Sequence, residues 1–358
     1  MNNTFHTLTI KELQKSTQDS VVLSFDIPKD LIETFKFVQG QYLTLRTTIN
    51  GEEVRRSYSL CSSPIDNQWK VGIKKVEGGK FSTHANEILK QGDVLEVMPA
   101  QGHFTTPIET NARRNFVCYA AGSGITPMVS IIKTHLHEEP LSKFKLFYVN
   151  QKASTVMLKE ELEALKNKYM DRFEIYYFLT KQKRNIPFLN GRLSTEKLEI
   201  IDANICELSS IDHHFICGPE AMTLSIKEFL LSKGSDEMSI HFELFGTDQK
   251  ANESHKKELA KSLKGKRCVL TIIEGGKQME LNIEQGAENI LDVALNNSAD
   301  LPFACKGGVC ATCKAKVTEG EVKMLLSYGL EPDEIEAGYI LTCQSIPITE
   351  KLVVDFDS

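Results

Sequence analysis

The sequence predicts a multidomain chain in which an antiparallel β-barrel precedes an α/β domain with a parallel sheet and a small C-terminal domain. With 358 residues, the chain is longer than one ordinary hydrophobic core requires. Short strand-like stretches fill the first hundred residues, whereas from Phe116 onward apolar strands alternate with helices. Four of the nine cysteines lie between Cys305 and Cys343, and this cluster indicates a third domain.

The first domain is predicted to be a barrel of short antiparallel strands. Clusters of proline, glycine and asparagine separate strand-like stretches at 21–27, 42–47, 69–76 and 94–98. Several short strands at such a spacing are typical of an antiparallel barrel. We place this domain at residues 1–107.

The second domain is predicted to contain a parallel sheet. Its expected strands are 116–120, 145–149, 173–178 and 214–216. Its expected helices are 126–136, 158–166 and 221–232. Strands that alternate with helices predict parallel pairing, and we place this domain at residues 108–247.

A linker is predicted between the second and third domains. Residues 248–266 lose apolar periodicity and carry six lysines, which is typical of a solvated segment. After it, 268–273 and 278–283 predict a hairpin, and 290–296 predicts a short helix. The third domain is therefore expected at residues 267–358.

Composition limits the classes of partner. The chain is 41% hydrophobic and 25% charged, as in globular proteins, and its net charge of −6 argues against a nucleic-acid partner. The longest apolar-looking stretch, 116–132, is interrupted by glycine, serine, threonine and proline, unlike a membrane span. The N-terminal residues lack the basic and apolar regions of a secretory signal, so we expect a cytoplasmic protein without a membrane partner.

The cysteine spacing predicts an iron–sulfur cluster. Cys305, Cys310 and Cys313 form a C-x4-C-x2-C pattern, and Cys343 follows after 29 intervening residues. This is the ligand spacing of plant-type 2Fe-2S clusters. We expect these four residues to be the metal ligands.

A structural zinc site is the alternative. Zinc more often uses two close C-x2–4-C pairs, and only one such pair is present here. The spacing therefore favours the 2Fe-2S cluster. Four isolated cysteines are expected to be packing residues: Cys61, Cys118, Cys206 and Cys268.

A short motif at the end of the barrel pattern predicts flavin contacts. Arg56, Ser57, Tyr58 and Ser59 form an R-x-Y-S string, which resembles the flavin-binding motif of the ferredoxin-NADP reductase superfamily. Arg56 offers a planar fork for a diphosphate, and Tyr58 offers an aromatic face to the flavin. Ser59 is suited to hydrogen-bond the N5 region of the flavin.

A second segment, about twenty residues later, resembles the next flavin-binding segment of that superfamily. The expected contacts are Gly79, Lys80, Phe81, Ser82 and Thr83. Glycine N–H groups and hydroxyls at a helix start can hold a pyrophosphate. A hairpin turn followed by an ordinary helix cap is the alternative, but the preceding R-x-Y-S motif favours FAD.

The string AGSGITP predicts a nucleotide-binding turn. It follows an apolar strand and opens a helix, which is the context of a phosphate-binding turn. It differs from a Rossmann fingerprint because Pro127 stands where the last glycine is needed. The string resembles the nicotinamide-nucleotide motif of the same superfamily. This resemblance implies contacts from Gly122, Ser123, Gly124, Thr126 and Pro127.

A C-G-P segment also follows a strand and starts a helix. It comprises Cys217, Gly218 and Pro219, followed by Glu220, and resembles the superfamily segment whose cysteine lies near the nicotinamide and the flavin. The resemblance implies that these residues bind cofactor. We expect Cys217 to shape the hydride-transfer pocket without forming a covalent bond; a buried small residue is the alternative.

The string HFELFG contains two further candidates. Glu243 and Phe245 resemble the position where the superfamily borders the flavin, although the string also fits a final sheet strand. The resemblance therefore implies Ser59, Cys217 and Glu243 as catalytic residues and Phe245 as a cofactor contact.

The adenosine end of the nucleotide is expected to carry a 2′-phosphate. Lys152, Ser154 and Lys181 are suited to meet that phosphate, and no acidic residue follows the strand to select NADH. Gln151 stands where many relatives carry an arginine, so NADH stays open as the alternative.

The whole chain resembles the fused reductases that supply electrons to multicomponent oxygenases. Residues 267–358 resemble a plant-type ferredoxin, which implies a β-grasp fold of the α+β class. The resemblance implies an enzyme that uses NADPH, FAD and a 2Fe-2S cluster, with an oxygenase of the phenylacetyl-CoA epoxidase type as its partner. The alternatives are a reductase of a hybrid-cluster protein or of a separate ferredoxin, and a non-enzymatic interaction protein on a decayed reductase scaffold.

Overall fold

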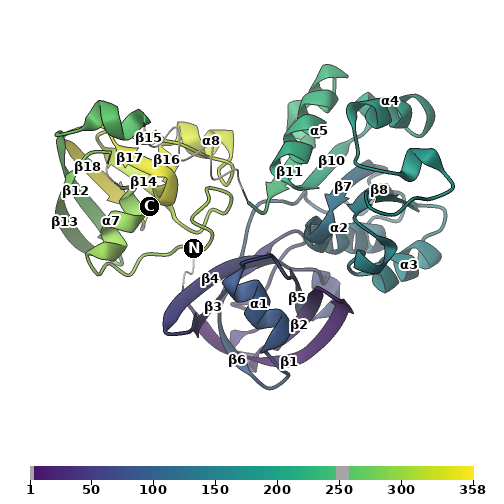
Figure 1. Ribbon diagram of the computed structural model, residues 1–358, viewed down its shortest axis with the longest axis horizontal. Coiled ribbons are helices and arrows are strands. Elements are labelled where there is room, and N and C mark those ends of the chain that lie inside the picture. The colour runs from purple at the N-terminus through teal and green to yellow at the C-terminus, as the bar shows by residue number, and fades with distance from the viewer. Residues whose placement is uncertain (1–3, 247–257, 287) are drawn as a thin grey trace. The chain divides into compact units, whose positions relative to one another are not determined.

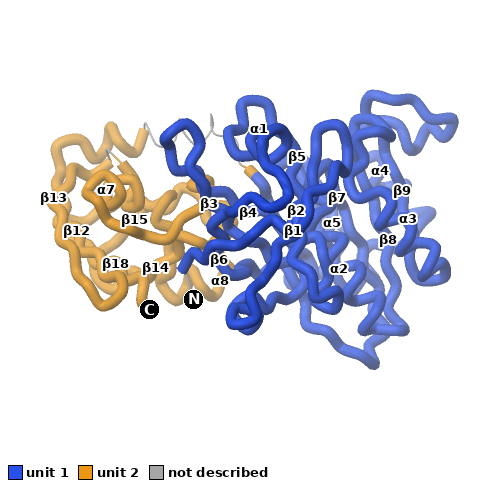
Figure 2. Tube along the Cα trace, turned by 90° about the horizontal axis from the view of Figure 1, so that it is seen from below, with its two compact units in different colours: residues 1–245 blue, residues 246–358 orange. Residues whose placement is uncertain are grey.

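The computed structural model describes residues 4–246, 258–286 and 288–358 (Figure 1). The chain divides into two compact units, Met1–Phe245 and Gly246–Ser358, coloured separately in Figure 2. Most of the expected linker, 248–257, lies outside the described residues. Each unit is described by itself.

The first part of unit 1 is an antiparallel barrel. Its strands are β1 (His6–Thr17), β2 (Ser20–Asp26), β3 (Tyr42–Ile49), β4 (Glu52–Ser59), β5 (Trp69–Lys74) and β6 (Val94–Gln101). They form a sheet in the order β4-β3-β6-β1-β2-β5, and a bridge between Leu60 and Val71 joins its two ends. Helix α1 (Lys80–Glu87) contributes Phe81 and Ala85 to the barrel core.

Two barrel strands were not predicted from the sequence. In β1 only Leu8 and Ile10 are fully buried, and β4 buries Val54 beside the polar Arg55 and Ser59. The apolar alternation on which the prediction depends is therefore short in β1 and absent from β4.

The second part of unit 1 is a parallel α/β domain. Its strands are β7 (Asn115–Ala121), β8 (Lys143–Asn150), β9 (Phe173–Leu179), β10 (His213–Gly218) and β11 (Ile240–Leu244), in the order β11-β10-β7-β8-β9. Its helices are α2 (Ile125–Glu138), α3 (Lys159–Lys168), α4 (Thr195–Asn204) and α5 (Glu220–Ser232). Helices α2 and α3 pack on one face of the sheet, and α4 and α5 pack on the other (Figure 1).

The order of these strands predicts where a ligand binds. The chain runs from β7 through β8 to β9 and then returns to the other side of β7, where β10 lies. Ligands of open parallel sheets bind beyond the carboxyl ends of the strands at such a reversal. The predicted nucleotide turn follows β7, and the C-G-P segment spans the end of β10 and the cap of α5.

Unit 2 contains a mixed five-stranded sheet in the order β13-β12-β18-β14-β16. The strands are β12 (Arg267–Glu274), β13 (Lys277–Glu284), β14 (Lys314–Glu319), β16 (Tyr339–Leu341) and β18 (Lys351–Asp355). A second, two-stranded sheet consists of β15 (Val322–Met324) and β17 (Ser345–Pro347). Helices α7 (Ile290–Asn296) and α8 (Pro332–Glu336) lie in the same unit. The hairpin and short helix predicted from the sequence correspond to β12, β13 and α7.

Part of the expected linker is structured. Residues 258–263 are helical, and Leu263 is buried. A Cβ atom at Gly286 would lie 2.9 Å from Ala260 Cα, so this helical turn packs closely against the end of the hairpin. Part of the expected linker is therefore helical and attached to the domain through Leu263, while most of its other side chains are exposed.

Candidate functional site

The R-x-Y-S residues lie at the end of β4. Ser59 is buried, whereas Arg56 is exposed and donates from its guanidinium to the Arg55 carbonyl over 2.6 Å. The Tyr58 ring lies 5.5 Å from the Phe81 ring, centroid to centroid, so the two predicted flavin segments touch. Burial raises the pKa of Tyr58, so its hydroxyl keeps its proton at neutral pH.

The N-terminus of α1 has no space for a side chain at Gly79. A Cβ atom at Gly79 would lie 2.5 Å from Ser82 Oγ. That oxygen accepts a hydrogen bond from the Val76 N–H over 3.1 Å and donates to the Gly79 carbonyl over 3.3 Å. The Ser82 hydroxyl therefore shapes the turn. The first N–H groups of a helix lack partners within it, so they are the groups this turn offers to an anion.

Other predicted members of this segment have contacts of their own. Lys80 pairs with Glu52 over 2.5 Å, Phe81 is in the barrel core, and Thr83 is half-buried in α1. Their contact with a flavin stays a prediction.

The nucleotide turn and the C-G-P segment are in direct contact. Gly122–Gly124 forms a 3-10 turn between β7 and α2, and a Cβ atom at Gly124 would lie only 2.1 Å from the Cys217 carbonyl oxygen. A Cβ atom at Gly218 would lie 2.5 Å from Met222 Cε and 3.1 Å from Ala121 Cβ. These glycines therefore allow two segments nearly a hundred residues apart to meet at the predicted ligand-binding edge.

The remaining residues of the two segments hold the turn. The Thr126 hydroxyl donates a hydrogen bond to the Ser123 carbonyl over 3.0 Å, and Pro127 is buried in the first turn of α2. The Tyr148 hydroxyl donates to the Gly122 carbonyl over 2.8 Å. Pro219 and Glu220 form the cap and the first residue of α5.

The barrel and the nucleotide domain also meet at a close contact. A Cβ atom at Gly72 in β5 would lie 2.6 Å from Thr126 Cγ2. The buried hydroxyls of Ser63 and Thr134 share a hydrogen bond of 2.6 Å across the same boundary. Thr126 therefore packs against the barrel as well as closing the nucleotide turn.

Three predicted catalytic residues come together. The Ser59 hydroxyl donates to a Glu243 carboxyl oxygen over 3.3 Å, and Glu243 is the register partner of Cys217 on the neighbouring parallel strand. Burial raises the pKa of Glu243 to about 8, and the Ser59 hydrogen bond only partly opposes it. At neutral pH this carboxyl is therefore largely protonated. Phe245 follows β11 and is 44% exposed.

Burial keeps the Cys217 thiol in its neutral form. Its side chain is fully buried, and burial, with the neighbouring Glu243 as a second cause, raises the pKa of its thiol well above the usual value. At pH 7 the thiol is neutral and the neighbouring Glu243 carboxyl is largely protonated. This agrees with a pocket-shaping role and disfavours covalent catalysis.

The three candidates for the 2′-phosphate are exposed at neighbouring strand ends. Lys152 and Ser154 follow β8, and Lys181 follows β9. The Lys181 N–H donates to the Gln151 carbonyl, and the Ala153 N–H donates to the side-chain oxygen of Gln182, each over 2.9 Å. Gln182 was missed, because only the folded chain brings these loops together.

The four predicted metal ligands form two pairs of thiols. Cys305 Sγ and Cys310 Sγ are 3.1 Å apart, and the thiol of Cys313 is hydrogen-bonded to that of Cys343. In the described part of the chain, no group of three or more His, Cys, Asp or Glu side chains is arranged to hold a single metal ion. Two pairs suit a cluster with two irons better than one tetrahedral zinc ion.

Backbone N–H groups lie around the pair formed by Cys305 and Cys310. The Gly307 N–H donates to Cys305 Sγ over 3.3 Å. The thiol of Cys310, followed by the N–H groups of Gly307, Cys310 and Val309, lowers the pKa of Cys305 to about 6. A Cβ atom at Gly329 would lie 2.8 Å from the Cys310 backbone, so the loop is tightly enclosed. Converging thiols and sulfur-directed N–H groups are the features that a 2Fe-2S cluster requires.

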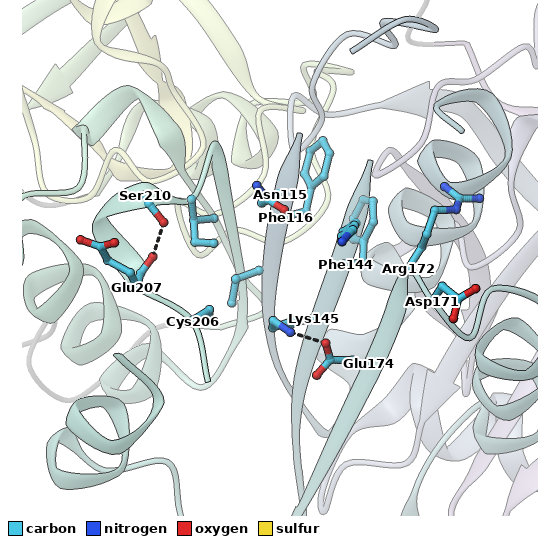
Figure 3. A pocket seen from close by; sticks show the side chains of 13 residues that line it. Asn115, Phe116, Phe144, Lys145, Asp171, Arg172, Glu174, Cys206, Glu207 and Ser210 are labelled. Carbon is cyan, nitrogen blue, oxygen red and sulfur yellow. Dashed lines mark hydrogen bonds and ion pairs between the residues drawn. The ribbon is translucent and has the colours of Figure 1, made fainter. Parts of the chain in front are cut away.

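A separate cavity of about 340 Å³ lies at the amino ends of β7 and β8 (Figure 3). It is at the opposite edge of the sheet from the nucleotide turn. Lys145 and Glu174 pair within it, and the Arg172 guanidinium donates to carbonyls at the end of α2, including that of Leu136. The charges of Lys145, Glu174 and Arg172 therefore already have partners within the protein.

No helix within the described residues combines the length and apolar character needed to cross a membrane.

Three family descriptions match consecutive parts of the chain. They are an oxidoreductase FAD-binding domain over residues 7–106, an oxidoreductase NAD-binding domain over 119–228, and a 2Fe-2S iron-sulfur cluster binding domain over 272–347. Their order is that of the barrel, the parallel α/β domain and the β-rich C-terminal unit.

Two relatives are similar over almost their whole length. The chain is 41% identical over 355 residues to a component of the 1,2-phenylacetyl-CoA epoxidase of Escherichia coli (strain K12), covering 99% of this chain and 98% of the relative. It is 30% identical over 358 residues to the ferredoxin reductase component of 3-ketosteroid-9-alpha-monooxygenase of Rhodococcus rhodochrous, covering 98% and 96%.

A solved structure shares the fold. The structure of phthalate dioxygenase reductase matches 98% of both chains with a TM-score of 0.57 and 22% sequence identity. The predicted barrel, parallel-sheet and C-terminal ferredoxin-type fold classes are therefore confirmed.

Proposed function

We propose that this chain delivers electrons from NADPH to an oxygenase of the phenylacetyl-CoA epoxidase type. The premise is that the chain belongs to the family of FAD- and 2Fe-2S-dependent reductases of multicomponent oxygenases. The chain is an NAD(P)H-dependent flavin and iron–sulfur oxidoreductase. The observation that carries the finer proposal is 41% identity over nearly the whole of both chains to the epoxidase component.

The residues of unit 1 are proposed to align the nicotinamide with the flavin. When bound, FAD accepts a hydride as two electrons and the 2Fe-2S centre carries electrons singly. The contact between Gly124 and Cys217 fixes the nucleotide turn against the pocket, and Ser59 with Glu243 supplies hydrogen-bonding groups without a charge at neutral pH. Arg56, Tyr58 and the start of α1 hold the flavin.

The nucleotide is proposed to be NADPH. Lys152, Ser154 and Lys181 are exposed at two adjoining strand ends, where they can surround a 2′-phosphate. The four cysteines of unit 2 are proposed to ligate the cluster, with Cys305 and Cys310 on one iron and Cys313 and Cys343 on the other.

We also propose that the protein acts in the cytoplasm. All nine cysteines are free thiols, and the four proposed ligands must remain reduced to bind iron.

The partner proposal is tested by reconstitution. The purified, cofactor-loaded protein is mixed with the oxygenase component of a phenylacetyl-CoA epoxidase, and NADPH consumption and epoxide formation are measured with and without phenylacetyl-CoA. We expect substrate-dependent NADPH consumption coupled to product. Reduction of a hybrid-cluster protein or a separate ferredoxin, without turnover of the oxygenase, would instead support the alternative function.

A further inference from the structure

Gln344 connects the two parts of the proposed ligand set. It follows Cys343 at the end of the 3-10 turn Thr342–Gln344. Its side-chain Nε2 donates to the Lys306 carbonyl over 3.0 Å and to Cys343 Sγ over 3.8 Å. One amide group therefore reaches both the cysteine loop and the fourth cysteine.

The rest of Gln344 is fixed by the fold. Its main-chain carbonyl accepts a hydrogen bond from the Leu325 N–H over 2.9 Å. A Cβ atom at Gly308 would lie 2.8 Å from Gln344 Cγ, and Gly308 has a φ of +73°, a conformation that favours glycine. The cysteine loop thus passes directly over the stem of Gln344, which limits the rotamers open to that side chain.

The contact with Lys306 bears on the sulfur hydrogen bonds. Lys306 has a φ of 52°, which is uncommon for a residue with a side chain. The Gln344 side-chain amide donates to the Lys306 carbonyl, and Asp292 forms an ion pair with the Lys306 ammonium group over 2.8 Å. The next residue, Gly307, directs its N–H at Cys305 Sγ. The Lys306 carbonyl and the Gly307 N–H belong to the same peptide group. Loss of the Gln344 amide would therefore release the peptide group that directs this N–H at Cys305 Sγ.

We propose that Gln344 is a positioning residue that raises the reduction potential of the cluster by directing N–H groups at Cys343 and Cys305. N–H groups near ligand sulfurs stabilise the reduced, more negative cluster, and hydrogen bonds to the sulfurs are among the determinants of its potential. This inference rests on the four-cysteine ligand set proposed above.

The test uses the full-length, cofactor-loaded protein. Gln344→Met keeps an unbranched side chain of similar size but removes the donor. We expect the reduced-to-oxidised ratio of the cluster at a fixed potential to fall roughly tenfold, which is about 59 mV for a one-electron couple. The potential is measured by following the cluster's electron paramagnetic resonance signal in solutions of defined potential. Gln278→Met, on exposed β13 of the same unit, is the matched control and should leave the potential unchanged.

Two further neutral variants separate hydrogen bonding from packing. Gln344→Asn retains an N–H donor and should keep a potential closer to the wild-type value than Gln344→Leu, which has no donor. This comparison decides the matter if Gln344→Met fails to retain iron. A wild-type potential in iron-loaded Gln344→Met, or equal potentials in the Asn and Leu variants, overturns the inference. Full iron content in Cys343→Ala would show instead that the ligand set is wrong.

Discussion

Cys217 and Cys305 show how two parts of one chain treat the same side chain in opposite ways. In unit 1, burial raises the pKa of the Cys217 thiol, whose neighbour Glu243 is also a buried acid. In unit 2, the Cys310 thiol and nearby backbone N–H groups lower the pKa of Cys305. Burial therefore disfavours the charged thiolate at Cys217, whereas a neighbouring thiol and backbone N–H groups favour it at Cys305. In the same loop the pKa values of Cys310 and Cys313 are raised, so this stabilisation of charge is specific to the Cys305 sulfur.

The largest expected effect is at the cysteine loop. Cys310→Ser should lose the cluster, so reduction of cytochrome c should fall to background. Ferricyanide reduction should survive, because all the residues proposed to bind the flavin belong to unit 1. Iron content and both reductase assays test this. Cys206→Ser, an isolated and half-buried thiol, is the control and should keep both activities. Loss of ferricyanide reduction in a folded, flavin-loaded Cys310→Ser protein would contradict the proposed order of electron flow.

The next effect tests close packing at the hydride pocket. In Gly124→Ala the new methyl group would meet the Cys217 carbonyl at 2.1 Å, so one of the two segments must move. We expect a loss of about 1–3 kcal/mol in the free energy of unfolding, together with slower reduction of the flavin by NADPH. Denaturant unfolding and stopped-flow absorbance measure the two effects. Gly246→Ala, where a Cβ atom meets nothing within 4 Å, should be neutral. Equal stability of the two variants would show that the contact at Gly124 is not restrictive.

A pH series sharpens the contrast in charge. Because burial raises the pKa of Glu243 from 4.5 to about 8, the folded protein holds a proton that the unfolded chain releases. The stability contributed by this group is complete below about pH 4.5 and is lost as pH rises through about 8. Glu243→Gln, which is neutral at every pH, should remove this part of the decline. Unfolding free energies across that range measure it, and parallel curves for the two proteins would refute the assignment.

The smallest expected effect concerns nucleotide choice. We expect a higher kcat/KM with NADPH than with NADH, and Lys152→Ala should lower the NADPH value about tenfold while leaving NADH unchanged, because a charge-assisted contact to phosphate is lost. Lys183→Ala, an exposed lysine of the same loop as Lys181, serves as the comparison. Equal efficiencies with both nucleotides, or a preference that survives the loss of Lys152, would show that this side chain does not read the phosphate.

Where apolar periodicity was strong, the sequence was sufficient to predict the fold class of each domain. The helix expected at 290–296 matches α7, Ile290–Asn296, and the expected strands of the parallel sheet lie within β7, β8, β9 and β10. Strands β1 and β4 were missed because few of their residues are apolar and buried. The helical turn at 258–263 was missed because its lysines outweighed Leu263 in the pattern.

The candidate site was predictable in its residue types but not in its contacts. The motifs singled out Ser59, Cys217 and Glu243, yet no spacing rule relates positions so far apart, and only the folded chain shows Ser59 donating to Glu243. Gln182 and Gln344 gave no signal, since glutamine is common on surfaces and each acts through a backbone group of another segment. The roles of the motif residues toward their cofactors stay predictions.

The contact between Gly72 and Thr126 has a consequence for how such chains can evolve. One residue belongs to the barrel and the other to the nucleotide turn, and there is no room between them for a single additional carbon atom. A barrel taken from a relative with a larger residue at this position would push against the Thr126 methyl group, so that side chain would have to rotate or be replaced. In an alignment of homologous chains, side-chain size at the two positions should vary inversely. Recombination that exchanged either domain alone would require a compensating change in the other.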